Sequence, residues 1–151
     1  QMINKDANVE QARKAIKAFK DQGVECRVYM IMGLPGEPAD IVDRTWQFIQ
    51  ETSPELVYLS LLTIRPGTDM FANPKKYGIK WVGQDWQNTM HMYSRYEDER
   101  PTLTFEYEDT TPWGKALSND QIIDNYLSLQ QRLKEAGIRS LGKRPTADDY
   151  V

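Results

Sequence analysis

Apolar residues recur every three or four positions in two stretches of the N-terminal half, a spacing typical of amphipathic helices. Residues 8–22 and 37–52 both show it, with charged or polar side chains on the opposite face. Gly23 stands where a left-handed helix cap is expected, and Pro38 suits a first helical turn. We therefore predict helices over residues 8–22 and 37–52.

Two short and nearly continuous apolar runs, residues 24–32 and 56–64, follow these helices. Both are closed by turns that contain glycine and proline. A strand that is covered on both faces shows such an unbroken run, so we predict two buried strands. The order helix, strand, helix, strand predicts a parallel sheet built from βαβ units.

After residue 72 the regular pattern gives way to scattered aromatic residues. Residues 73–101 show no sustained helical or strand period, so we predict irregular structure there, with one short helix around residues 86–93. This change divides the chain into an α/β part, residues 1–72, and a C-terminal extension, residues 73–151.

Two regular elements are predicted in the extension. Residues 102–107 alternate in the manner of a half-buried strand. Ser118 and Gln121 form a capping-box pattern ahead of helical spacing over residues 120–136, and Gly137 marks the end of that helix.

A parallel sheet of two strands is not stable by itself, because each strand needs neighbours at both edges and cover on both faces. We therefore expect the chain to be a fragment of a larger α/β protein. The open sheet edge beside residues 24–32 predicts self-association of the isolated chain.

Composition excludes several classes of protein. Charged residues make up 27% of the 151, which is close to the globular average and rules out whole-chain disorder. The net charge is −3 and no stretch concentrates basic residues, so nucleic-acid binding is not expected. No apolar run approaches the ~20 residues that span a membrane, and no signal peptide is evident. These features predict a cytoplasmic protein without membrane partners.

Cys26 and His91 are the single cysteine and the single histidine. One thiol and one imidazole cannot hold zinc, haem or an iron–sulfur cluster unaided, and no EF-hand spacing occurs, so we assign no metal to this chain. Cys26 begins a predicted strand and is interpreted as a buried structural thiol. His91 is interpreted as a packing or surface residue rather than a functional one.

The turn over residues 33–36 follows the carboxyl end of a predicted parallel strand, where α/β folds place their ligands. Gly33 lets a ligand approach the backbone closely, and Pro35-Gly36 suits a type II turn. The amides that open the next helix could bind an anion or a polar group. The same residues also suit a tight turn that binds nothing. No phosphate-binding glycine motif occurs, so nucleoside-triphosphate chemistry has no support.

A second turn, Arg65-Pro66-Gly67-Thr68, ends the next strand in the same way. In a barrel both turns would open on one face. Arg65 could bind a carboxylate or a phosphate, although a solvated arginine is the commoner case at a strand end.

Over residues 4–77 the chain resembles the radical S-adenosylmethionine (SAM) superfamily. Residues 33–37 resemble the glycine-rich motif after the fifth strand of that family, whose neighbourhood contacts the adenosyl part of SAM. Residues 66–68 resemble the PGT turn of the branch that contains cobalamin-dependent members and methylthiotransferases. The segments that carry the resemblance, in order, are Asn4-Lys5, KDQGVE (20–25), MGLPGE (32–37), TWQFIQE (45–51) and RPGTDMF (65–71).

The resemblance implies that residues 1–72 are C-terminal β/α units of a partial (β/α) TIM-type barrel, followed by an α+β extension. It assigns a contribution to the SAM pocket to Met32, Gly33, Leu34, Pro35, Gly36 and Glu37. The substrate side falls to Leu62, Arg65 and Thr68. Four aromatic residues of the extension would either cover the barrel mouth or anchor the extension: Trp81, Trp86, Tyr93 and Trp113.

One departure from the family decides what the chain can do alone. Radical SAM enzymes bind a 4Fe-4S cluster through a CxxxCxxC loop, and this chain has no such loop. The resemblance therefore implies that the cluster-binding N-terminal half lies outside this chain, which is inactive by itself and holds no catalytic residue. In the full-length protein it implies SAM and the cluster as cofactors. The branch with the PGT turn contains members with and without cobalamin, and it suggests methyl transfer, ring formation or methylthiolation as reactions. The alternative is a non-catalytic α/β interaction or ligand-binding domain.

Overall fold

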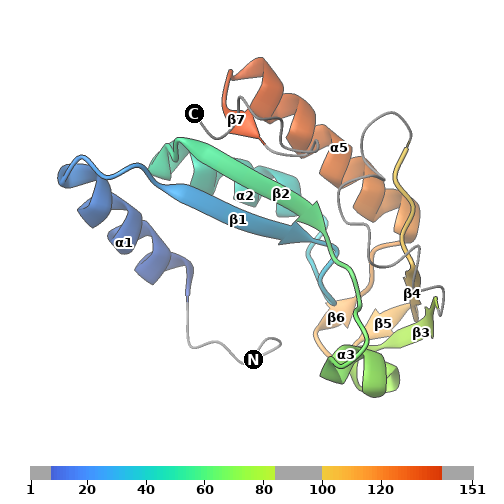
Figure 1. The fold of residues 1–151 in the computed structure, drawn as a ribbon. Helices are drawn as coiled ribbons and strands as arrows, with labels where there is room; N and C mark the ends of the chain where they lie inside the picture. The colour runs from blue at the N-terminus through green and yellow to red at the C-terminus, as the bar shows by residue number, and fades with distance from the viewer. Residues whose placement is uncertain (1–7, 84–99, 141–151) are drawn as a thin grey trace.

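The structure, a computed structural model, describes residues 8–83 and 100–140. It is a mixed α/β fold with a three-stranded parallel sheet in the order β1-β2-β7 and two small antiparallel pairs, β3-β4 and β5-β6 (Figure 1). The described ranges form no closed barrel. The elements are α1 (Val9–Asp21), β1 (Arg27–Met32), α2 (Ile41–Thr52), β2 (Leu56–Leu61), α3 (Asp69–Ala72), the 3-10 helix η1 (Pro74–Tyr77), β3 (Ile79–Val82), β4 (Phe105–Tyr107), β5 (Thr110–Thr111), β6 (Gly114–Lys115), α5 (Asn119–Glu135) and β7 (Arg139–Ser140).

The parallel sheet confirms the predicted βαβ order and extends it. β1 pairs with β2 from Arg27 opposite Leu56 to Met32 opposite Leu61, and β7 pairs with the first two residues of β2. Helix α2 joins β1 to β2, and α5 joins β2 to β7 after an inserted segment, residues 62–118. The sequence pattern did not predict β7, because a strand of two residues carries no periodicity.

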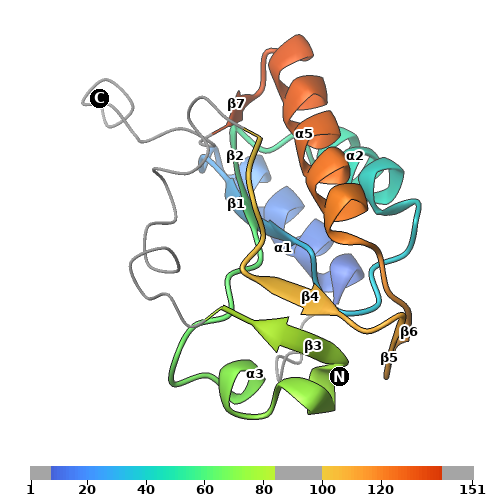
Figure 2. The same cartoon turned by 90° about the vertical axis from the view of Figure 1, so that its right-hand side faces the viewer.

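Helices α1, α2 and α5 lie on the same side of this sheet (Figures 1 and 2). Alternate residues of β2 point toward them and are buried, namely Val57, Leu59 and Leu61. Side chains of the helices pack against these strand residues and form one core with them. The most completely buried are Ile49, Ile122, Tyr126, Leu129 and Leu133.

The opposite face of β1 is open, and here the prediction of a buried strand is wrong. Tyr29 is 75% exposed and Ile31 is 51% exposed, while Met32 alone in β1 is buried. The Tyr29 ring stacks on that of Tyr58 in β2, with ring centroids 4.3 Å apart. The unbroken apolar run predicted cover on both faces, but the described residues cover only one.

The helix ends follow their capping signals. Asn8 and Gln11 form a capping box at the start of α1, and Ser118 and Gln121 form one at the start of α5. Gly23 and Gly137 have the positive φ expected after a helix, at +73° and +67°. These ends were predicted correctly.

Helix α2 begins at Ile41 rather than at residue 37 as predicted. The side chain of Glu37 turns back toward the preceding strand end, and the chain makes a further turn in which Ile41 N donates to Pro38 O at 3.1 Å. The predicted strand over residues 102–107 is confirmed only for its last three residues, β4. The helix predicted around residues 86–93 lies outside the described residues.

The structure also bears on the expectations for Cys26 and for membrane-spanning segments. Cys26 is buried, as predicted, with its Sγ 3.7 Å from the carbonyl oxygen of Ile16. Among the described helices, none combines the length and the apolar character needed to cross a membrane.

Candidate functional site

The first candidate turn joins β1 to the segment before α2. Glu37 N donates to Leu34 O at 3.2 Å, which closes a four-residue turn with Pro35 and Gly36 at its centre. Gly36 has a φ of +72°, the positive value that a type II turn requires at this position. Pro35 is fully buried, so the turn is packed into the protein rather than presented as a loop tip.

The carboxylate of Glu37 closes the turn from inside. Its Oε2 accepts a hydrogen bond from Gly33 N and its Oε1 accepts one from Leu34 N, each at 2.9 Å. The residue is only 9% exposed, and this burial raises the pKa of Glu37, although the two backbone hydrogen bonds act in the opposite direction. The two amides at the strand end are thus bonded to a side chain of the same turn.

The extension covers the turn from outside. The hydroxyl of Tyr107 in β4 donates to Gly33 O at 2.7 Å. Burial raises the pKa of Tyr107, and the negative charge of Glu37 adds to the effect. This hydroxyl therefore stays protonated and serves as a donor across the ordinary pH range.

Two glycines of the turn allow close contact with the extension. A Cβ atom at Gly36 would lie 2.6 Å from Trp113 Cβ and 2.9 Å from the carbonyl carbon of that residue. A Cβ atom at Gly33 would lie 3.1 Å from Ile122 Cγ2 of α5. At Gly36 glycine is required for packing as well as for positive φ, whereas a side chain at Gly33 would have to displace Ile122 slightly.

The second candidate turn is closed by Thr68 N, which donates to Arg65 O at 3.2 Å, and Gly67 has a φ of +85°. The hydroxyl of Thr68 donates to Arg65 O and accepts from Phe71 N, so it caps α3. Arg65 and Thr68 are exposed. The hydroxyl of Thr68, which was predicted to lie on the substrate side, is thus already hydrogen-bonded to backbone groups next to it in the chain.

Leu62 connects the two turns. Its backbone nitrogen donates to Met32 O at 2.8 Å, and its Cβ atom lies 3.7 Å from the position of a Cβ on Gly33. The structure therefore brings Met32, Gly33 and Leu62 together, whereas Arg65 and Thr68 lie beyond them on the surface.

Sequence reasoning missed the contribution of Tyr107 and Ile122 to this region. The alternation over residues 102–107 correctly indicated that Phe105 and Tyr107 point inward. It carried no information on the partner of the Tyr107 hydroxyl, because Gly33 lies 74 residues away in the chain.

Among the described residues of the inserted segment, Asp69 carries a strongly perturbed carboxylate. Its pKa is lowered to about 2 by hydrogen bonds from Lys76, Tyr77 and Asn73, in that order of effect. All three donors lie within eight residues of Asp69, so this cluster stabilises α3 and η1 and needs no ligand to explain it.

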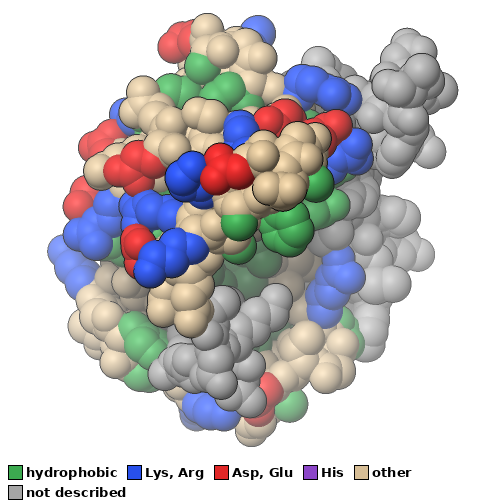
Figure 3. All heavy atoms as spheres, turned by 90° about the vertical axis from the view of Figure 1, so that its left-hand side faces the viewer, with side chains coloured by type: hydrophobic (Ala, Val, Ile, Leu, Met, Phe, Trp, Pro, Cys, Tyr) green, Lys and Arg blue, Asp and Glu red, His purple; other side chains and the backbone are tan. Residues whose placement is uncertain are grey.

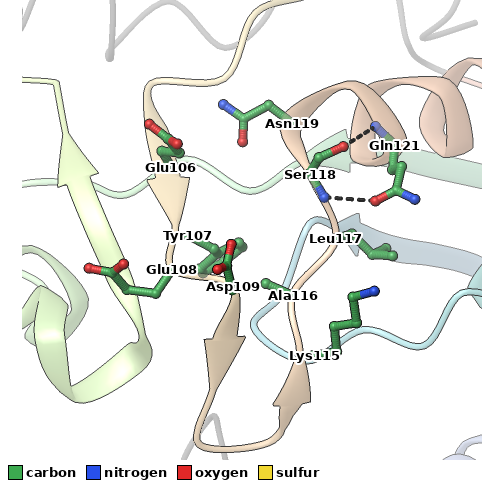
Figure 4. A pocket seen from close by; sticks show the side chains of 10 residues that line it. All are labelled: Glu106, Tyr107, Glu108, Asp109, Lys115, Ala116, Leu117, Ser118, Asn119 and Gln121. Carbon is green, nitrogen blue, oxygen red and sulfur yellow. Dashed lines mark hydrogen bonds between the residues drawn. The ribbon is translucent and has the colours of Figure 1, made fainter.

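A pocket of about 620 Å³ lies between β4, the β5-β6 hairpin and the start of α5 (Figure 4). Three acidic side chains and Lys115 line it, but Glu106 is paired with Lys80 at 3.0 Å. Ser118 and Gln121 at its rim are bonded to each other in the capping box. No group of His, Cys, Asp or Glu in the described ranges is arranged to hold a metal ion. The lining is Glu106, Tyr107, Glu108, Asp109, Lys115, Ala116, Leu117, Ser118, Asn119 and Gln121.

A mostly apolar groove of about 530 Å³ runs between α1 and the edge of β1 that no described strand pairs with. Its exposed members include Phe19 and Val24, and its floor includes Met30 and Phe48. The side of the molecule that carries α1 shows hydrophobic side chains at the surface among charged ones (Figure 3).

The aromatic residues of the extension divide between described and undescribed parts of the chain. Trp81 in β3 and Trp113 are both exposed, and Trp113 also stacks on Tyr77 with ring centroids 5.9 Å apart. His91, Trp86 and Tyr93 lie outside the described residues.

Comparison with known proteins gives one distant relative. The chain is 30% identical over 70 residues to the anaerobic magnesium-protoporphyrin IX monomethyl ester cyclase of Rubrivivax gelatinosus. The match spans 46% of this chain and 13% of the cyclase, so the chain corresponds to a small part of that protein. No protein-family model matches the chain, and no solved structure does.

Proposed function

We propose that the chain is the C-terminal part of a radical SAM enzyme, in which residues 1–72 belong to a partial barrel and residues 73–151 form an extension. The sequence supports this in two ways. The segments over residues 4–77 resemble that superfamily and follow each other in the same order along the chain, and the chain has a distant relative among cyclases. Of the reactions that the resemblance implies, the activity named for this relative favours ring formation by radical chemistry.

The arrangement of the helices is the observation that carries the proposal. Doubly wound folds place helices on both faces of the sheet, whereas a barrel places them all outside. Here α1, α2 and α5 lie on one face, and the strands follow each other in chain order (Figure 2). The exposed face with Tyr29 and Ile31 would then line the interior of the barrel.

The described residues do not fit a 4Fe-4S cluster. Cys26 is buried beside α1, and no set of three metal-binding side chains occurs in the described ranges. We assign the cluster ligands to the N-terminal half of the full-length protein.

The fit to SAM is partial. The amides of Gly33 and Leu34 are bonded to Glu37, and the carbonyl of Gly33 is bonded to Tyr107. Leu34 is partly exposed, as is Leu62 on the adjoining strand end. We propose that the turn offers the adenosyl group a shaped apolar surface, while hydrogen bonds to SAM come from elsewhere in the barrel. When bound, SAM would supply the radical chemistry.

The N-terminal half of the same protein is the partner that we propose for the open edge of β1. Within the described residues β1 has a strand neighbour on one side only, and the adjoining groove exposes Phe19 and Val24. A preceding strand and helix would pair with the edge and fill the groove.

Iron content tests the proposal. The full-length gene product, purified without oxygen, should contain about four iron and four sulfide ions per chain. The same preparation should be assayed for bound corrinoid, which decides between cobalamin-dependent and cobalamin-independent branches. A full-length protein that holds no iron–sulfur cluster after anaerobic reconstitution would refute the enzyme assignment.

The second candidate is a non-catalytic α/β interaction domain. One observation favours it: Gly33 N, Leu34 N and Gly33 O already form hydrogen bonds to side chains of this chain. A full-length protein without a cluster would support this second candidate.

A further inference from the structure

We infer that Tyr107 and Trp113 are positioning residues that hold the turn over residues 33–37 in its observed conformation. The extension then forms part of the proposed cofactor site, although it lies 70 and more residues away in the chain. The link to SAM binding rests on the proposed function, whereas the effect on the turn does not.

The first step of the argument concerns the peptide groups of Gly33. Its nitrogen donates to Glu37 at 2.9 Å, and its oxygen accepts from the Tyr107 hydroxyl at 2.7 Å. Gly33 has a φ of +92°, a region that glycine reaches easily but also leaves easily. A flexible residue is thus held from both sides, once by its own turn and once by β4.

The second step concerns the hairpin β5-β6, which touches the turn at Gly36. Trp113 N donates to Thr111 Oγ1 at 3.2 Å, and that hydroxyl donates to Gly114 O at 3.1 Å, so the hairpin is internally braced. Trp113 also stacks on Tyr77. The hairpin therefore presents a rigid surface to the Cα atom of Gly36, which has no room for a side chain.

These two contacts act on the same short turn from β4 and from the hairpin. Leu34 belongs to this turn and Leu62 lies against Gly33, so a shift of the turn would move the surface that we propose for the adenosyl group. We expect such a shift to weaken SAM binding without unfolding the protein.

The variant Tyr107→Phe tests the inference in the full-length protein. It removes the hydrogen bond to Gly33 O and leaves the ring in place. Tyr126→Phe is the matched control, since Tyr126 is a buried tyrosine whose hydroxyl accepts from Gln130 Nε2 at 2.6 Å within α5. Trp113→Ala is a second variant, which loosens the hairpin and is used if Tyr107→Phe does not fold.

Two measurements are made on each variant: hydrogen exchange by mass spectrometry in peptides that cover residues 31–37, and the Kd for SAM by titration. Tyr107→Phe should speed exchange in these peptides several-fold and up to about tenfold, and should raise the Kd for SAM by a similar factor. Tyr126→Phe should change neither, even where it lowers the Tm as much.

A folded Tyr107→Phe protein with wild-type exchange over residues 31–37 would overturn the inference, and so would equal changes in Tyr126→Phe. If the wild-type protein binds no SAM while Tyr107→Phe still speeds exchange, the proposed function fails and the positioning role stands. The two failures are therefore distinguishable.

Discussion

At the residue scale, Glu37 shows two opposing effects on one carboxylate. Burial raises its pKa above the ordinary value of 4.5, and the hydrogen bonds from Leu34 N and Gly33 N lower it by less. Between the pKa of the unfolded chain and the raised pKa of the folded one, the folded state binds more protons. The contribution of this group to the free energy of unfolding therefore falls as the pH rises through that window.

Glu37→Gln should reveal this dependence, because glutamine does not titrate. The difference in free energy of unfolding between wild type and Glu37→Gln should decrease as the pH rises from 4.5 toward neutrality, as measured by urea denaturation at several pH values. A difference that grows over this range would mean that the two backbone hydrogen bonds outweigh burial.

Gly36 and Gly67 offer a matched pair for the packing of the first turn. Both have positive φ, at +72° and +85°, but a Cβ atom meets Trp113 only at Gly36 and finds nothing within 4 Å at Gly67. Gly67→Ala should cost about 1 kcal/mol from φ alone. Gly36→Ala should cost about 1–3 kcal/mol more, because the hairpin must move.

Denaturant unfolding of both glycine variants measures this difference. Equal losses of stability would show that a side chain at Gly36 fits beside Trp113 at no extra cost. The tight packing of the turn against the hairpin would then contribute nothing measurable to stability.

At the element scale, the sequence predicted those features that depend on near neighbours. Helix α5 and its start were predicted because Ser118 and Gln121 carry the capping signal within four residues. The start of α2 was not predicted, since it depends on where the Glu37 side chain turns. β7 and the contact between Tyr107 and Gly33 depend on tertiary packing, which leaves no periodic signal.

Helix α5 gives the test at this scale. Ser118→Ala removes the oxygen that accepts from Gln121 N at 3.3 Å and should lower the free energy of unfolding by about 1 kcal/mol. Ser128→Ala, at an exposed position inside the same helix, should leave stability unchanged or slightly raised. Equal losses in both variants would contradict a role for the capping box.

At the scale of the whole molecule, the main feature is a parallel sheet that, in the described residues, has helices on one face only (Figure 2). Its helices cover one face. In the described part of the chain no strand pairs with the outer edge of β1, and Tyr29 and Ile31 are exposed on the other face. The apolar character of the exposed face is what predicted a strand covered on both sides. The mismatch between this pattern and the structure is explained if the missing cover belongs to another part of the full-length protein.

Self-association of the isolated chain follows from this open surface. Sedimentation of the 151-residue chain at rising concentration should show dimers or larger species. Ile31→Glu should weaken the association, and Val9→Glu, at a similarly exposed apolar residue of α1, serves as control. A chain that stays monomeric at high concentration would count against the proposal that residues 1–72 are part of a larger barrel.

The most direct test of the radical SAM assignment is the formation of 5′-deoxyadenosine. The full-length protein, anaerobically reconstituted with iron and sulfide and reduced in the presence of SAM, should release 5′-deoxyadenosine even without substrate. The 151-residue chain under the same conditions should release none, because its described residues hold no cluster site. A reconstituted and reduced full-length protein that leaves SAM intact would contradict the assignment.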